Sequence, residues 1–246
     1  ASTLTGPLPG LAEATFEANP ESLDEEKAAI LKRAGITRVS MGLQASQHRL
    51  LRGLGRVAMS GDFVRAYSEL RAAGFKSINA DLMCGLPGQS VSDMKESLAW
   101  LLALRPEHIS LYALEIHEGT PFHSAGIKED PEAAAAMYET AAVELEAAGL
   151  ERYEISNFSR AGHRCLHNLN YWDQGRYLGL GAAAASYLDG ERTTATEDLG
   201  TYIASVTACG LPEYQSREKL SGRRLRAERI MLGLRKTGGV ELESDI

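Results

Sequence analysis

The chain has 246 residues, of which 44% are hydrophobic and 24% are charged, a composition typical of a globular protein with a substantial buried core. Its formal net charge of −7 argues against a broad basic surface for nucleic acid. No apolar stretch approaches the roughly 18 residues of a membrane-spanning helix, and the odd number of cysteines does not predict a disulfide scaffold. We therefore expect a cytoplasmic protein with no membrane span and no nucleic-acid partner.

Helix-like segments alternate with short β-rich runs through the first 160 residues. The runs that we predict as strands lie at residues 14–19, 36–44, 75–83, 107–115 and 150–158. A helix is expected before each of the last four runs, and Gly35, Gly74 and Gly149 suit the left-handed residue that follows a helix. This alternation predicts an α/β fold with five parallel strands, which fits part of a (β/α) barrel; an open doubly wound sheet is the alternative.

Two of the expected helices carry start signals. Residues 22–35 begin with Ser22, and an acidic residue, Glu25, follows three positions later. Residues 90–104 repeat the spacing with Ser90 and Asp93. Such a pair can satisfy the backbone N–H groups that the first helical turn leaves without partners. We therefore predict a capped helix at both places.

Each predicted strand finishes on polar residues. These residues are Glu17, Gln44, Asp81, Glu115 and the pair Ser156–Asn157. Active sites of barrels lie at the carboxyl ends of the strands, so we expect these side chains to face one mouth. Asp81 is the most informative, because it ends a buried run just before Gly-Leu-Pro-Gly, and a buried carboxylate is costly without a partner. Either a neighbouring residue or a ligand must satisfy it.

The pattern changes after residue 160. Residues 162–194 are rich in glycine, aromatic and small residues and show no helical periodicity, and two helical stretches are expected around 196–207 and 221–236. We predict two domains: a partial barrel at residues 1–160, and at 161–246 a mixed helical and loop extension, in which a loop that carries HNLNYW precedes the start of a helical C-terminal domain. Because the last residues begin an element without finishing it, we expect the chain to be a fragment at both ends.

The segment GLGAAAAS at residues 179–186 resembles a nucleotide-binding pattern. Gly179, Gly181 and Ala184 fit G-x-G-x-x-A, which cradles a dinucleotide in the first strand–helix unit of its fold. Here the segment comes late, after the barrel pattern. Close packing by small residues is therefore the interpretation that we favour.

Seven motifs occur in a fixed order along the chain. They are FEANP, RVSMGLQAS, LGR, INADLMCGLPGQ, HISLYALEIHEGTPF, YEISNF and HNLNYW. Together, from about Thr15 to about Arg235, they resemble the radical S-adenosylmethionine family of oxygen-independent coproporphyrinogen III oxidases, and more closely its heme-chaperone branch. The resemblance implies a partial (β/α)6 barrel. It also implies S-adenosylmethionine, a 4Fe-4S cluster and heme as cofactors, with heme or a porphyrinogen and a heme-acceptor protein as partners.

The resemblance assigns cofactor contacts to particular residues. The polar contacts to S-adenosylmethionine fall on Glu17, Gln44, Arg56 and Asp81, and the apolar or backbone contacts fall on Ala113 and Ile155. The chemistry is suitable, because an arginine can grip a carboxylate with two parallel hydrogen bonds. The two carboxylates can accept from an ammonium or from ribose hydroxyls. Taken singly, Glu17 suits a turn and Arg56 a solvated surface; their joint placement favours the functional interpretation.

The motif HNLNYW, at residues 167–172, carries the heme-chaperone assignment. By resemblance, His167 is a heme ligand, and an exposed imidazole is a competent axial ligand of heme iron. The alternative is a loop in which the histidine and two aromatic residues only close over the barrel. His163 and Cys165 are weaker candidates. Ala185 stands where the family usually has a histidine, so a role for that position is in doubt.

The cysteines do not match the cluster motif of the family. A 4Fe-4S cluster of this kind is held by a C-x3-C-x2-C run, and Cys84, Cys165 and Cys209 cannot make that loop. No cluster ligand is therefore predicted in this chain, and Cys84 is expected to be a small buried residue. No catalytic residue is predicted, and whether the chain is an enzyme stays open.

Three functions are compatible with these motifs. The first is a heme-binding and heme-delivering member of the family. The second is an oxidase that decarboxylates the propionates of coproporphyrinogen III in porphyrin biosynthesis. The third is a non-catalytic barrel that binds a nucleoside or a tetrapyrrole.

Overall fold

The computed structural model describes residues 11–241, and the chain divides into two compact units. The first unit ends at Cys165 and the second begins at Leu166. Within the described range, no helix combines the length and the hydrophobicity that are needed to cross a membrane.

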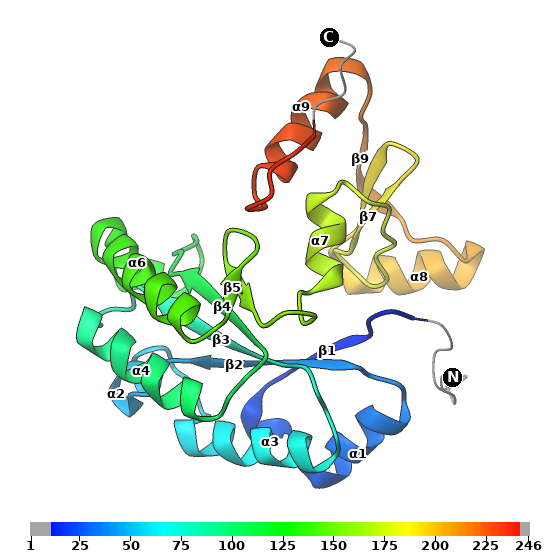
Figure 1. The fold of residues 1–246 in the computed structure, drawn as a ribbon. Helices are drawn as coiled ribbons and strands as arrows, with labels where there is room; N and C mark the ends of the chain where they lie inside the picture. Colours follow the sequence, from blue (N-terminus) through cyan, green and yellow to red (C-terminus); the bar gives the residue numbers. More distant parts are fainter. Residues whose placement is uncertain (1–10, 242–246) are drawn as a thin grey trace. The chain divides into compact units, whose positions relative to one another are not determined.

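The first unit is built around one six-stranded sheet (Figure 1). Its strands are β1 (Thr15–Ala18), β2 (Arg38–Gln44), β3 (Ile78–Cys84), β4 (His108–Ala113), β5 (Glu151–Arg152) and β6 (Asn157–Ser159). The order across the sheet is β1-β2-β3-β4-β6-β5, and the first four strands are parallel. The predicted succession of parallel strands is therefore confirmed for β1 to β4.

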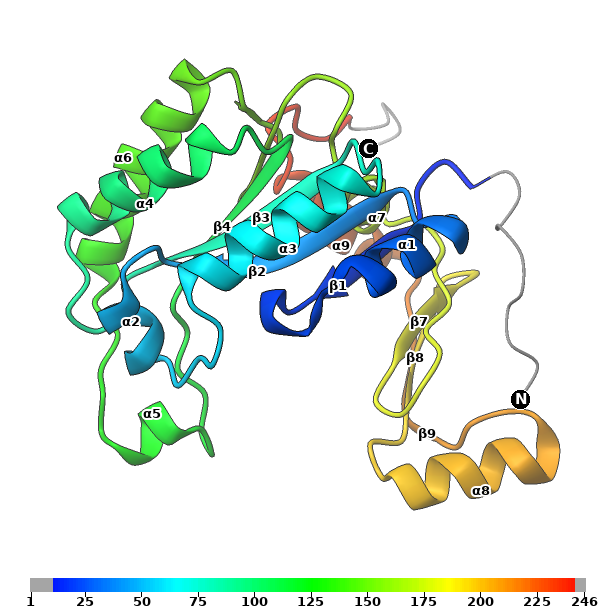
Figure 2. The ribbon, with the colours of Figure 1, turned by 90° about the horizontal axis from the view of Figure 1, so that it is seen from below.

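Four long helices connect these strands and lie on one face of the sheet, as Figures 1 and 2 both show. They are α1 (Glu25–Arg33), α3 (Ser60–Ala72), α4 (Val91–Ala103) and α6 (Pro131–Ala147). The shorter elements are the 3-10 helix η1 (Pro20–Ser22), α2 (His48–Gly53) and α5 (Pro121–Ser124). Gly35, Gly74 and Gly149 follow α1, α3 and α6 with φ of 86°, 83° and 78°, the left-handed conformation that the sequence predicts.

The two predicted helix starts have different outcomes. Ser90 caps α4 as expected: its hydroxyl accepts from the Asp93 N–H, and the Asp93 carboxylate accepts from the Ser90 N–H. The capping box predicted at Ser22 is wrong. Ser22 ends η1, where its hydroxyl donates to the Asn19 carbonyl, and the N-cap of α1 is instead Asp24.

The parallel strands separate an apolar face from a polar face. On β2, Val39, Met41 and Leu43 alternate with polar or small residues and are at most 3% exposed. These residues and their counterparts on β3 and β4 belong to the hydrophobic core, which includes apolar residues of the long helices. The opposite face of the same strands carries polar residues, because successive side chains of a strand point to opposite faces.

The fifth predicted strand is wrong in direction. The chain forms β5, turns at residues 153–156, and returns as β6, which is inserted antiparallel beside β4. The Ser156 N–H donates to the Glu154 carboxylate, and this bond stabilises the turn. A parallel strand needs a crossover connection, whereas this short hairpin supplies the edge partner of β4 locally.

The second unit contains a three-stranded antiparallel sheet that was not expected. Its strands are β7 (Ala185–Leu188), β8 (Glu191–Ala195) and β9 (Tyr214–Lys219), in that order. Asp189 and Gly190, both with positive φ, form the two-residue turn between β7 and β8. An Asp-Gly pair between β-rich runs is a hairpin signal, so this hairpin was available from the sequence.

The helices of the second unit are α7 (Leu166–Trp172), α8 (Leu199–Cys209) and α9 (Gly222–Gly233). The last two confirm the helical stretches predicted around 196–207 and 221–236. The expected loop at HNLNYW is wrong, because this motif lies in α7. Gly179 packs so closely that an added Cβ would lie 2.2 Å from the Ala185 carbonyl oxygen, which agrees with the close-packing interpretation.

Candidate functional site

A polar cavity of about 510 Å³ lies on the polar face of the first unit, towards the carboxyl ends of its parallel strands. Its lining residues are Glu17, Ala18, Asn19, Ser40, Gly42, Gln44, Arg56, Asp81 and Tyr112. The structure therefore brings together the four polar residues that the sequence assigns to the cofactor. They come from β1, β2, β3 and the segment after α2, which are far apart in the sequence.

Other residues expected at this mouth do not line the cavity. Glu115 lies beyond the end of β4 and is 76% exposed, with its carboxylate 3.8 Å from His117 Nε2. Ser156 and Asn157 belong to the turn and strand that return beside β4. Ala113 and Ile155 are also absent from the lining, and the Ile155 carbonyl accepts from the Tyr138 hydroxyl at 2.5 Å.

The end of β2 is irregular, and this irregularity aims Gln44 into the cavity. The pairing of β2 with β3 shifts register between Gly42 and Gln44, and Gln44 has φ of 70°. Bulges of this kind re-aim side chains, and a left-handed non-glycine residue costs on the order of 1 kcal/mol or more. A Cβ on Gly42 would lie 2.6 Å from Gln44 Nε2 and 2.9 Å from Arg56 Nη2. Glycine at position 42 therefore leaves the space that both side chains occupy.

Arg56 reaches the cavity from the segment that follows α2. Gly55, with φ of 69°, ends the helical turn, and the Arg56 N–H then donates to the Leu51 carbonyl at 3.0 Å. Arg56 Nη2 donates to the Gly42 carbonyl at 2.7 Å, which ties the guanidinium to β2. Because a guanidinium has five N–H donors, this bond leaves donors for an anionic group in the cavity.

Asp81 is satisfied in part by its own strand. Its Oδ1 accepts from Asn79 Nδ2 at 2.7 Å. Burial raises the pKa of Asp81, whereas the hydrogen bond from Asn79, the nearby Ser110 hydroxyl and the charge of Arg38 act in the opposite direction. The carboxylate also faces the cavity, so a ligand with donor groups can complete its hydrogen bonding.

Sequence reasoning missed several polar residues of this site. They are Ser40, Asn79, His108, Ser110 and Tyr112. The signal was present: in each parallel strand these residues alternate with apolar ones, for example Asn79 and Asp81 with Ala80 and Leu82. In a parallel sheet buried on both faces, a polar side chain at alternate positions indicates a polar layer.

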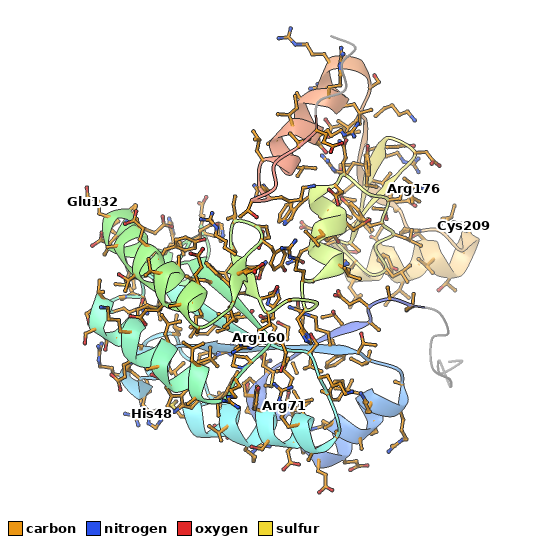
Figure 3. The ribbon with its side chains drawn as sticks, in the orientation of Figure 1. His48, Arg71, Glu132, Arg160, Arg176 and Cys209 are labelled. Atoms are coloured by element: carbon orange, nitrogen blue, oxygen red, sulfur yellow. The ribbon has the colours of Figure 1, made fainter. Side chains whose placement is uncertain are left out.

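A separate charged cluster lies at the opposite end of β4. Arg71 of α3, labelled in Figure 3, pairs with Glu107 at 2.7 Å, and the N–H of Arg160 donates to the Glu107 carbonyl at 2.9 Å. Glu107 also accepts from the N–H at the start of β3. This cluster joins α3 to the amino-terminal ends of two strands and is structural.

The second unit presents His167 on α7. The His167 side chain is exposed, and its ring lies edge-on to Tyr171, with centroids 4.6 Å apart at 82°. Tyr171 in turn lies edge-on to Tyr177 at 4.6 Å. A small cavity of about 160 Å³ adjoins the rings of Tyr171 and Tyr177. Its lining residues are Tyr171, Trp172, Gln174, Gly175, Tyr177, Tyr187, Arg192, Glu228 and Leu232.

The cysteines are not arranged as metal ligands. Among residues 11–241 no group of three or more His, Cys, Asp or Glu residues is placed to hold a metal ion. Cys84 is fully buried, as predicted, and burial raises the pKa of its thiol to about 12. Cys165 is 3% exposed, which makes it a poor candidate for a heme ligand, and Cys209 lies at the end of α8 (Figure 3).

The chain resembles known proteins along most of its length. Residues 8–101 match the Radical SAM superfamily. The heme chaperone HemW of Bacillus subtilis (strain 168) is 38% identical over 239 residues, which cover 95% of this chain and 63% of that protein. The heme chaperone HemW of Mycobacterium tuberculosis (strain CDC 1551 / Oshkosh) is 36% identical over 236 residues, which cover 94% of this chain and 60% of that protein.

The fold also has a solved counterpart. Coproporphyrinogen III oxidase (HemN) from Escherichia coli, a radical SAM enzyme, matches with a TM-score of 0.79 at 20% identity, over 91% of this chain and 55% of that chain. At this level of identity the likeness shows the fold, and it confirms the predicted α/β class with a partial barrel. The mixed sheet of the first unit agrees with it.

Residues 8–101 therefore match the radical S-adenosylmethionine superfamily, and most of the residues that line the polar cavity lie in this segment. Within this class the chain is homologous to the proteins named heme chaperone HemW, which confirms the resemblance found in the sequence. The chain spans about three fifths of the length of these two relatives.

Proposed function

We propose that this chain binds S-adenosylmethionine in the cavity of the first unit and heme at His167 of the second, and that it acts in heme delivery. The observation that carries the first part is that Glu17, Gln44, Arg56 and Asp81 line one cavity. The homology to heme chaperones supports the second part.

The donor set of the cavity suits S-adenosylmethionine. When bound, this cofactor would supply a sulfonium centre as its reactive group. Its carboxylate, ammonium, ribose diol and adenine are the groups that the protein can recognise. Arg56 holds the carboxylate through its remaining N–H donors. Glu17 and Asp81 accept hydrogen bonds from the ammonium or the ribose hydroxyls, and Gln44 both donates and accepts.

The cysteines of this chain do not fit a 4Fe-4S cluster. Cys84 and Cys165 are buried and Cys209 belongs to the second unit, and their sequence spacing does not make a C-x3-C-x2-C loop. We therefore assign no reaction step through a cluster to the residues described here. Binding and orientation of the cofactor are the roles that these residues can perform.

His167 is the proposed axial ligand of heme. The side chain is exposed on α7, and neutral imidazole is a common ligand of heme iron. The ring contact with Tyr171, one helical turn further along, favours a defined orientation of the imidazole. The natural recipient of the heme is then a heme-acceptor protein.

Cofactor binding is tested by titrating S-adenosylmethionine into the protein in a calorimeter. We expect saturable binding to the wild type and weaker binding to Asp81→Asn and to Arg56→Lys, which loses the two-pronged guanidinium. Arg52→Lys, on the exposed side of α2, is the matched control and should bind as the wild type does. Equal affinity in all four proteins would refute the cavity assignment.

Heme binding is tested by following the Soret absorption band during a heme titration. We expect His167→Ala to lose the shift of this band that marks bound heme, and His117→Ala, which removes a histidine that is 76% exposed, to keep it. The same preparation is assayed for turnover of coproporphyrinogen III. Turnover without a His167-dependent heme complex would favour the oxidase, and binding of nucleoside alone would favour a non-catalytic barrel.

A further inference from the structure

A chain of hydrogen bonds runs beneath the cavity of the first unit. It starts at Asp81, which lines the cavity, and continues through Asn79 and His108 to Tyr153. Asn79 is 1% exposed and His108 is fully buried, so bulk water does not compete for these bonds. Asn79 precedes Asp81 by two residues on β3, which places both side chains on the polar face of the sheet.

The amide of Asn79 is satisfied on both of its atoms. Its Nδ2 donates to Asp81 Oδ1 and to Ser40 Oγ, each at 2.7 Å. Its Oδ1 accepts from His108 at 2.5 Å and from the Ser110 hydroxyl at 3.1 Å. A flipped amide would turn its oxygen towards the Asp81 carboxylate and repel it, so the network permits one orientation.

His108 supports that orientation through the contact of its Nδ1 with the Asn79 oxygen. Burial, and to a smaller extent the charges of Arg38 and His163, hold the pKa of His108 well below its ordinary value. Its Nδ1 donates to Asn79, so its Nε2 accepts from the Tyr153 hydroxyl at 2.7 Å. The Tyr153 oxygen also accepts from the N–H of Cys165 at 3.1 Å, which holds the hydroxyl in place beside His108.

We propose that Asn79 is a positioning residue, whose locked amide holds the Asp81 carboxylate as a preset acceptor for the ligand of the cavity. A side chain that is already ordered loses less conformational freedom when the ligand binds, so part of the cost of binding is removed. The inference rests on the proposed function, because it takes S-adenosylmethionine as the ligand.

The other groups around Asp81 do not replace this contact. Glu17 of β1 acts on the carboxylate as a like charge, and Arg38 of β2 as an opposite charge. From β4 come the Ser110 hydroxyl and Tyr112, whose pKa burial raises, so that it is neutral near pH 7. No ion pair of Asp81 is formed within the described residues, which leaves Asn79 as the side chain that fixes its Oδ1.

The test compares wild type, Asn79→Ala and Ser110→Ala in two measurements. The first is the dissociation constant for S-adenosylmethionine by calorimetry between about pH 4.5 and 7.5. The second is the titration of Asp81 by carboxyl carbon NMR without ligand, with its resonance assigned through Asp81→Asn. Ser97→Ala is the control: this fully buried serine of α4 bonds to Ser46 and Gln47 and does not line the cavity.

We expect Asn79→Ala to bind about tenfold more weakly near pH 7, as the loss of a hydrogen bond to a charged group implies. The donor stabilises the ionised carboxylate, so its removal raises the pKa of Asp81, and binding is then lost at a higher pH than in the wild type. Ser110→Ala should change the dissociation constant and the pKa of Asp81 in the same direction as Asn79→Ala, but by less. Ser97→Ala should lower thermal stability and leave the dissociation constant and the pKa of Asp81 unchanged.

The outcomes separate this inference from the proposed function. If the wild type does not bind S-adenosylmethionine, the proposed function fails, and the NMR titration still decides whether Asn79 controls the Asp81 carboxylate. If the Asp81 titration is the same in wild type and Asn79→Ala, the positioning role is overturned. Equal affinity in these two proteins, with a wild type that binds, overturns it as well. Should Asn79→Ala fail to fold, Asn79→Ser, which changes the same position less, applies the same criteria.

Discussion

The ring of His167 lies edge-on to the ring of Tyr171, with centroids 4.6 Å apart and planes at 82°. The two residues are four positions apart on α7, which puts them on the same side of the helix. This relationship gives a physical reason for the spacing of histidine and tyrosine in HNLNYW. The tyrosine ring packs against the imidazole that we propose as heme ligand.

The first prediction concerns this pair. Tyr171→Ala should weaken heme binding severalfold, because an aromatic pair contributes about 0.5–1.5 kcal/mol beyond its buried area. Tyr171→Phe keeps the ring and should bind heme as the wild type does. Soret titrations of the three proteins measure the effect. Equal heme affinity in Tyr171→Ala would show that His167 needs no aromatic support.

A second prediction concerns the glycine at the floor of the cavity. Gly42→Ala should reduce affinity for S-adenosylmethionine about tenfold or more, since its Cβ would lie 2.6 Å from Gln44 Nε2 and 2.9 Å from Arg56 Nη2. Both groups belong to flexible side chains and can move aside, so the melting temperature should change little. Gly61→Ala in α3, where an added Cβ meets nothing within 4 Å, is the control. Unchanged affinity in Gly42→Ala would mean that neither side chain contacts the ligand.

A third prediction concerns the dependence of stability on pH. The pKa of folded His108 lies well below its ordinary value of 6.5, whereas the unfolded chain protonates it near that value. The unfolded state therefore binds more protons below about pH 6.5, and the stabilisation that is complete above this pH is lost progressively as the pH falls. His108→Gln should reduce this slope, which for one group is at most about 1.4 kcal/mol per pH unit.

The measurement is urea unfolding of both proteins between about pH 5 and 7.5. His117→Ala, which removes an exposed histidine, should retain the wild-type slope. The same slope in His108→Gln and wild type would mean that another group causes the dependence of stability on pH.

A fourth prediction concerns Arg38, a residue of β2 that is 6% exposed. Its Nε has no hydrogen-bond partner, and its guanidinium forms no ion pair with any residue between 11 and 241. Because an unpaired buried charge is costly, Arg38→Met should leave the free energy of unfolding unchanged or raise it by on the order of 1 kcal/mol. The charge of Arg38 lowers the pKa of Asp81, so the variant should also lose S-adenosylmethionine at a higher pH.

Chemical denaturation and calorimetry measure these two effects. Arg33→Met, at the exposed end of α1, serves as a surface control that should change stability by less than about 0.5 kcal/mol. A loss of several kcal/mol in Arg38→Met would mean that the guanidinium stabilises the fold.

The parallel core of the fold could be predicted because its signals are local. Ser90 and Asp93 start a helix, Gly35 and Gly74 end two others, and the apolar runs between them read as strands. The capping box predicted at Ser22 was wrong because a proline two residues earlier begins a 3-10 turn, which moves the helix cap to Asp24. The hairpin of β7 and β8 was missed although Asp189 and Gly190 indicate it.

The candidate site could be predicted in part. Glu17, Gln44, Arg56 and Asp81 were assigned by motif, and the structure places all four around one cavity. Their contacts with S-adenosylmethionine, and those of Ala113, Ile155 and His167 with their cofactors, stay predictions.

The sequence by itself determined the helix–strand alternation, the polar ends of β1, β2 and β3, and the family motifs. Only the tertiary structure decided that β6 returns antiparallel beside β4, that a bulge turns Gln44 inward, and that Asn79 joins Asp81 to His108. The physical reason is that a period of two along a strand tells which face a side chain occupies. Which residue it meets there depends on the register between strands, and register is set by contacts between residues that are distant in the sequence.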